Sequence, residues 1–235
     1  MSGSVDPAAI DVRRRTDGEW PVRLRGVTET VVATLGPNDR WNVAALGVHA
    51  PEGDDGDAAS TGRDADDADR SAGHAAATAT TWGNTRTRRN FRRRGGGVVQ
   101  FTPDPREFVD AALTIREEPE PVLAGADAWV RVDAERVDAG ESGGTRREEW
   151  RLAPREGAVR REHPHATNRG YYAVIDATVA ASRLDVPSYD TGTLLDRLSY
   201  FAETVERCGG PAEREAMRRV DEATGWRDRL DGDGG

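Results

Sequence analysis

The sequence predicts an α+β fold, with strands up to about residue 155 and helices after it. Residues 20–35 and 41–49 are rich in β-branched and alternating apolar side chains and flank a Gly-Pro-Asn-Asp turn signal, which is typical of a hairpin. Residues 171–182 and 194–205 instead repeat apolar side chains at helical spacing. Strands followed by helices in separate blocks indicate an α+β chain, or a barrel with an appended helical lobe.

The remaining elements follow from shorter signals. We expect strands over residues 75–82, 98–102, 128–137 and 145–152, the last two joined by a Gly-rich turn. Asp104, Pro105 and Glu107 predict the start of a helix, because Asp caps, Pro fits the first turn and Glu stands three residues after the cap. Asn168 is the expected cap of the helix after it, and residues 212–224 form a third C-terminal helix.

Composition divides the chain into four regions. We expect a flexible arm over residues 1–18, a β-rich domain over 19–160, a helical lobe over 161–227 and a flexible tail over 228–235. The β-rich domain contains an acidic insertion, residues 50–74, which we predict to be disordered. Its residues 52–70 hold eight acids and two arginines, a net charge of −6 against −9 for the whole chain.

The overall composition indicates a salt-adapted protein. All 33 basic residues are arginine, and they face 42 acids. Such an acidic, lysine-free composition is typical of a halophilic archaeon, in which high net charge maintains solubility. The single cysteine, Cys208, excludes an internal disulfide and is expected to be a small buried side chain. No apolar segment approaches the roughly 20 residues that span a bilayer, and no signal peptide is visible, so we expect a cytoplasmic protein.

Residues 81–94 hold the densest positive charge in the chain. Six arginines fall within residues 86–94, with no carboxylate among them. Guanidinium groups and short hydroxyls both direct donors at clustered anionic oxygens. The cluster therefore predicts a phosphate ligand, either on a small cofactor or on a nucleic acid. The six are Arg86, Arg88, Arg89, Arg92, Arg93 and Arg94.

Other chemistries have little support in the sequence. His163-Pro-His165 lacks further ligands at metal spacing, so we interpret it as a surface turn and expect no metal. The acidic insertion lacks EF-hand spacing. No nucleophile elbow, Walker loop, dinucleotide fingerprint or HExxH motif is present. No catalytic residue can be named from the sequence.

Four short blocks in order resemble one family. They begin at Gly26 (GVTET), Asn42 (NVAALG), Thr85 (TRTRRNF) and Gln100 (QFTPDP). Together they resemble the archaeal family catalogued as domain of unknown function 447, within the FMN-binding split barrels of the flavin reductase superfamily. Two positions depart from the pattern: Ala45 replaces a proline and Gln100 replaces an asparagine.

The resemblance implies a mainly antiparallel split β-barrel with a C-terminal helical lobe. It also implies one FMN per subunit at a homodimer interface. We expect NAD(P)H or a pterin-like small molecule as a further partner. The residues that we expect at the cofactor, all but Trp82 from the four blocks, are Glu29, Thr30, Asn42, Ala44, Gly47, Trp82, Thr85, Arg86, Thr87, Arg88, Arg89, Asn90 and Gln100.

Within this set, the residues around Thr87 form the expected phosphate site. If Thr87 caps a helical turn, backbone N–H groups add to the side-chain donors. Arg92 to Arg94 fall outside this set and have the alternative interpretation of a solvated helix end. Glu29 is a candidate proton donor beside reduced flavin or a structural ion-pair partner. Trp82 is a candidate stacking residue or a core aromatic.

Three functions remain open at this point. The first is an FMN-dependent oxidoreductase, the second a non-catalytic flavin carrier, and the third an arginine-mediated nucleic-acid binder. About six phosphate contacts give a logarithmic salt slope near −5, so tenfold more salt weakens binding by about five decades. In molar salt, with a Debye length of about 3 Å, an arginine patch alone would not hold nucleic acid. We therefore favour a single phosphate held in a preformed site.

Overall fold

The computed structural model describes residues 12–51, 75–164 and 166–232. These form two compact units. The first, mainly strands, takes in the chain up to residue 101 apart from 43–45, together with residues 118–163. The second, mainly helices, takes in residues 102–117 and the chain from 164 onward. Most of the predicted acidic insertion lies outside the described residues.

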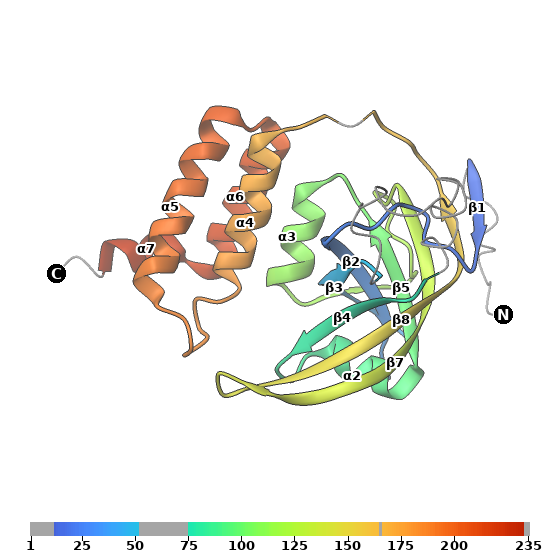
Figure 1. Cartoon of the computed structure of the whole chain (residues 1–235). Coiled ribbons are helices and arrows are strands. Elements are labelled where there is room, and N and C mark those ends of the chain that lie inside the picture. The colour runs from blue at the N-terminus through green and yellow to red at the C-terminus, as the bar shows by residue number, and fades with distance from the viewer. Residues whose placement is uncertain (1–11, 52–74, 165, 233–235) are drawn as a thin grey trace, which may run out of the picture. The chain divides into compact units, whose positions relative to one another are not determined.

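The first unit is an antiparallel β-barrel, which confirms the predicted fold (Figure 1). Among the described residues, its strands follow the order β8-β4-β3-β2-β5-β7, and β7 pairs again with β8 to close the ring. β1 continues the sheet from β8, and β6 pairs with β3. The strands are β1 (Arg14–Asp17), β2 (Val27–Leu35), β3 (Trp41–His49), β4 (Ala77–Trp82), β5 (Gly96–Phe101), β6 (Arg116–Glu118), β7 (Ala128–Ser142) and β8 (Thr145–Val159).

β7 and β8 form a hairpin that is longer than predicted. Gly143 and Gly144 have φ values of 57° and 75°, the left-handed conformation that a two-residue hairpin turn requires. Ser142 pairs with Thr145 across this turn. The sequence prediction ended these strands at residues 137 and 152. It stopped early on β7 because residues from Glu135 to the turn are exposed on both faces, so no apolar alternation marks them.

Regular structure also reaches into the predicted arm and tail. Arg14–Asp17, within the expected arm, pair with β8 as β1. At the other end, α7 (Trp226–Gly232) extends into the expected tail. Neither segment has an apolar pattern of its own, because β1 is a polar edge strand and α7 buries mainly Trp226.

The second unit is built from helices, and the caps of two of them were predicted. Asp104 caps α3 by accepting from the backbone N–H of Arg106, and Asn168 caps α4 by accepting from Gly170 and Tyr171. One apolar core joins these helices. Cys208 is exposed rather than buried, because it lies on the solvent side of the last turn of α5. The helices are α3 (Pro105–Leu113), α4 (Arg169–Ala181), α5 (Thr191–Cys208), α6 (Pro211–Thr224) and α7.

None of the described helices combines the length and the apolar character that would be needed to cross a bilayer.

Gly170 allows a close approach between the start of α4 and the end of α5. A Cβ at this position would lie 2.4 Å from the Cα of Gly209. We expect Gly170→Ala to lower the free energy of unfolding by about 1–3 kcal/mol, because overpacking forces the helices apart. Gly192→Ala is the matched control: its Cβ would meet only Asp190 Oδ1, at 3.6 Å, and alanine favours a helix by about 0.5–1 kcal/mol. Urea unfolding of both variants measures the difference, and equal effects would contradict this account.

Tyr171 should ionise late. Burial raises the pKa of its phenol from 10.0 to about 12, with smaller contributions from Tyr172, Asp104 and Glu213. Because the folded pKa lies above the unfolded value, the stabilisation is complete below pH 10 and is lost as the pH rises towards 12. A titration of tyrosinate absorbance should show this late step in the native protein and lack it in Tyr171→Phe. Ionisation of every tyrosine near pH 10 would contradict it.

Candidate anion site at the start of the arginine helix

The arginine cluster forms a helix, α2 (Arg86–Arg94), between β4 and β5 (Figure 1). Thr85 is its cap, and the Thr85 hydroxyl oxygen accepts from the backbone N–H of Arg88 at 3.3 Å. Thr87, which the sequence suggested as the cap, lies buried inside the first turn. Gly95, at φ 69°, ends the helix. The helix cap is therefore Thr85, two residues earlier than expected.

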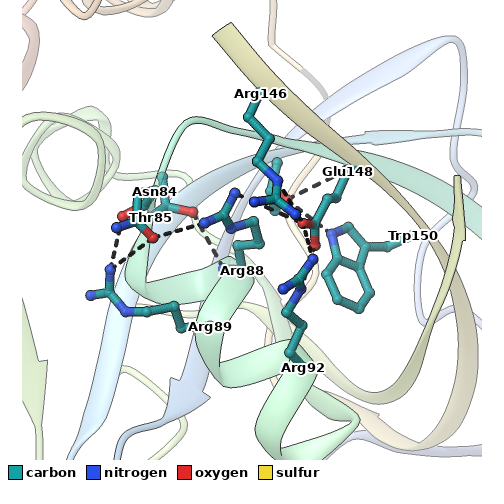
Figure 2. A network of polar contacts seen from close by, with 9 residues as sticks. Asn84, Thr85, Arg88, Arg89, Arg92, Arg146, Glu148 and Trp150 are labelled. Atoms are coloured by element: carbon teal, nitrogen blue, oxygen red, sulfur yellow. Dashed lines mark hydrogen bonds and ion pairs between the residues drawn. The ribbon is translucent and has the colours of Figure 1, made fainter. Parts of the chain in front are cut away.

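A buried carboxylate on β8 organises the arginines (Figure 2). Glu148 is fully buried and accepts from Arg92 through both carboxylate oxygens, with Nε at 2.9 Å from Oε2. Arg146 Nε lies 3.5 Å and Arg88 Nη1 3.8 Å from Glu148 Oε1. Three arginines thus surround one carboxylate. Glu148 was not predicted, since 56 positions separate it from Arg92 and no local pattern marks it.

Arg88 connects this carboxylate to the loop before α2. It is buried, at 7 % exposure, and its Nη2 donates to Asn84 Oδ1 at 2.8 Å. Arg89 Nη1 donates to the same residue, to the carbonyl oxygen at 2.9 Å and to Oδ1 at 3.3 Å. Asn84 is therefore a shared acceptor, visible at the start of α2 in Figure 2. Asn84 was not among the residues predicted from the sequence.

The last turn of α2 is only partly solvated. Arg93 and Arg94 are exposed, and Arg94 pairs with Asp39 at 3.9 Å. Arg92, which the sequence grouped with them as a solvated helix end, is instead held by Glu148. Cations in the last helical turn also interact favourably with the helix dipole.

Asn90 and Phe91 also fix α2 to the barrel. Asn90 Nδ2 donates to Thr34 on β2, at 3.1 Å to the hydroxyl oxygen. Phe91 packs on Trp150 with ring centroids 5.2 Å apart, and the Trp150 indole N–H donates to Thr81 Oγ1 at 2.9 Å. Asn90, predicted to be a ligand of the cofactor, is thus placed as an anchor of α2 in this structure.

β2 and β3 carry the next predicted residues. Thr30 is buried and its hydroxyl donates to the carbonyl of Leu46 at 2.7 Å, whereas Glu29 is exposed. Neighbouring residues of a strand face opposite sides, so these two side chains lie on opposite faces of β2. Glu29 lies beside Gly47, where a Cβ would be 3.8 Å from both carboxylate oxygens. Glu29 is therefore not the buried acid that a low-dielectric proton site would need.

The remaining predicted residues are spread over the adjoining strands. Asn42 is buried at the start of β3, and Ala44 is half-buried two residues on. Gln100 on β5 is fully buried with both ends of its amide engaged: Nε2 donates to Pro121 O at 3.0 Å, and Oε1 accepts from Leu123 N at 2.7 Å. These strands are consecutive in the sheet, in the order β4-β3-β2-β5, so the predicted residues belong to one part of the barrel.

The exposed aromatic and basic candidates have distinct environments. Trp82 is half exposed at the end of β4, which favours the stacking interpretation over a core aromatic. His163 Nε2 lies 3.3 Å from Asp127 Oδ2, while His165 is outside the described residues. No cluster of three His, Cys, Asp or Glu suited to a metal occurs in the described ranges.

The start of α2 has the chemistry of an anion site. Its first turn carries no acidic residue, and the N–H groups of a first turn have no carbonyl partner inside the helix. Arg86 and Arg89 add positive charge there. Behind them, three arginines stand against the single charge of Glu148, so positive charge remains in excess.

Loss of the buried carboxylate should be costly. We expect Glu148→Gln to lower the free energy of unfolding by about 3–5 kcal/mol, because Arg88 is left buried without its counter-charge. Glu135→Gln is the control on the same hairpin: Glu135 pairs with Arg151, and both are exposed, so its loss should cost about 0–1 kcal/mol. Urea unfolding compares the two. A small effect for Glu148→Gln would show that the cluster rearranges freely.

Comparison with known proteins places the chain in a family. The family model described as "Protein of unknown function (DUF447) N-terminal domain" matches residues 28–161, and its C-terminal counterpart matches 168–222. A crystal structure of an FMN-bound protein of this family from Methanosarcina mazei is similar, at 20% identity and a TM-score of 0.64, over 86% of this chain and 96% of that one.

Two further structures are more distant. The styrene monooxygenase flavin reductase from Pseudomonas putida S12 gives 13% identity and a TM-score of 0.32 over 62% of this chain and 94% of that one. A putative oxidoreductase from Sinorhizobium meliloti 1021 gives 10% identity and a TM-score of 0.34, over 57% of this chain and 47% of that one. Likeness at this level carries no argument. The family models alone cover more than half of the sequence, and the chain belongs to the DUF447 family.

Proposed function

We propose that the chain binds FMN, with the phosphate at the start of α2, and acts as a flavin-dependent oxidoreductase on a small molecule. The observation that carries this proposal is the FMN-bound protein of the same family, whose fold matches over 96% of its length. The barrel provides the scaffold, but the fold by itself does not determine the reaction.

The residues at the start of α2 fit a phosphate dianion. Thr85 supplies a hydroxyl, Arg89 an exposed guanidinium, and the first turn its N–H groups, with no carboxylate there to oppose the phosphate. We place the ring along β2 and β3, where the half-buried Gly47 lies beside Glu29. When bound, FMN would supply a redox-active ring, and the protein would orient it and adjust its potential through hydrogen bonds.

The reaction and the partners form the less direct part of the proposal. We propose that the protein is a homodimer. We also propose that NAD(P)H reduces the bound FMN, which then reduces a pterin-like or flavin substrate. A non-catalytic flavin carrier is the alternative, and it would bind FMN without NADPH-driven reduction. Visible spectra recorded in high salt, with FMN and then NADPH added, separate the two. Protein that takes up no FMN under these conditions would contradict both.

The contacts of α2 argue against a nucleic-acid surface. Arg88 and Arg92 are committed to Glu148, Arg89 to Asn84 and Arg94 to Asp39. Guanidinium groups that already hold partners within the protein are less free to follow the spaced phosphates of a nucleic acid. They are better placed to present a fixed positive field to one phosphate.

Substitution of the cap tests the phosphate position. Thr85→Ala should weaken FMN binding about tenfold, because one hydroxyl donor and the helix cap are lost together. Thr85→Ser, which keeps both, should remain within about twofold of the native affinity. Riboflavin, which lacks the phosphate, should bind all three proteins alike in a flavin-fluorescence titration. Arg93→Ala is the control, because Arg93 is exposed at the far end of α2. A larger loss for Arg93→Ala than for Thr85→Ala would contradict the placement.

A further inference from the structure

We propose that Glu148 is a positioning residue: it holds Arg88 against Asn84 and so sets the phosphate-binding start of α2 for a phosphorylated flavin. This inference rests on the proposed FMN site. It adds two residues, Glu148 and Asn84, and explains how a buried carboxylate would favour the binding of an anion.

The contacts run without a break from the barrel to the start of α2. Glu148 Oε1 lies 3.8 Å from Arg88 Nη1, and Arg88 Nη2 donates to Asn84 Oδ1 at 2.8 Å. Asn84 in turn accepts from Arg89 at 2.9 Å and directly precedes the cap, Thr85. The loop has a second anchor, since Gly83 N donates to Arg146 O at 2.8 Å. Loss of the side-chain contacts should therefore misplace the arginines without unfolding the loop.

The burial of Arg88 is poorly explained by stability alone. Its Nε and Nη1 are buried without a hydrogen-bond partner, and its side chain is 8 % exposed. A buried ion pair of this kind is often no more stabilising than well-packed apolar residues of the same volume. An incompletely satisfied, buried guanidinium beside a helix start that carries no acid indicates a site whose positive charge is kept for a ligand.

The two effects of Glu148 on a bound phosphate have opposite signs. Through space, its negative charge opposes the phosphate, so its removal would strengthen binding. Through Arg88 and Asn84, it orients donors, so its removal would weaken binding. We assign the larger effect to orientation, because Glu148 is already surrounded by three arginines whereas Asn84 is the shared acceptor of Arg88 and Arg89.

The experiment measures the ratio of FMN to riboflavin affinity in four full-length proteins. These are the native protein, Glu148→Gln, Asn84→Ala and the double variant. We expect each single variant to lower the ratio about tenfold with riboflavin affinity unchanged, and the double variant to lower it no further, because both act through Arg88. Asn84 is exposed, so Asn84→Ala tests the inference even if Glu148→Gln fails to fold. Glu135→Gln should leave the ratio unchanged.

Each other outcome identifies what has failed. A native protein that binds no FMN overturns the proposed function and this inference with it. A native protein that binds FMN, with an unchanged or raised ratio in Asn84→Ala and in any folded Glu148→Gln, overturns this inference alone. Equal losses for FMN and riboflavin would make the role merely structural. If the reductions in the FMN-to-riboflavin affinity ratio add in the double variant, Glu148 and Asn84 act independently, and the proposed coupling through Arg88 is wrong.

Discussion

The buried carboxylate of Glu148 is the constraint on which the arrangement of the arginine helix depends. A fully buried charge must be paired and hydrogen-bonded, and Glu148 on β8 obtains its partners from α2 and from Arg146 of its own strand. This requirement fixes how α2 lies on the barrel. The apolar contact of Phe91 with Trp150, which is also on β8, and the hydrogen bond of Asn90 to Thr34 on β2 hold the same helix. α2 is therefore fixed to two strands of the barrel.

Helix caps could be predicted from the sequence, but contacts between residues far apart in the chain could not. The caps at Asp104 and Asn168 lie where their side-chain chemistry placed them, because a cap depends on residues two or three positions away. α2 was not predicted as a full helix, since Phe91 is its one large apolar residue and no apolar periodicity marks it. Its partner Glu148 lies 56 positions from Arg92. Nothing local distinguishes Glu148 from the exposed acids around it.

The residues that the resemblance indicated lie on consecutive strands of one part of the barrel, but the resemblance did not mark which of them have structural partners. Thr30, Asn90 and Gln100 all belong to the matching blocks, yet each has its side chain committed inside the protein. A short motif contains residues that the fold requires together with residues that the ligand requires. Hydrogen-bonded anchors therefore appear in such motifs beside residues that contact a ligand, and coordinates are needed to tell the two apart.

The arginine-only, acidic composition and the geometry of α2 are consistent with one another. Salt weakens interactions between exposed, separated charges, with a Debye length of about 3 Å at 1 M. Contacts such as Arg88 to Asn84 at 2.8 Å and Arg92 to Glu148 at 2.9 Å are direct and at least partly buried, so salt screens them less. Arginine suits them because its planar fork makes two directed bonds at once. A site built on such prearranged contacts would retain affinity for one phosphate under conditions in which a loose basic surface would lose it.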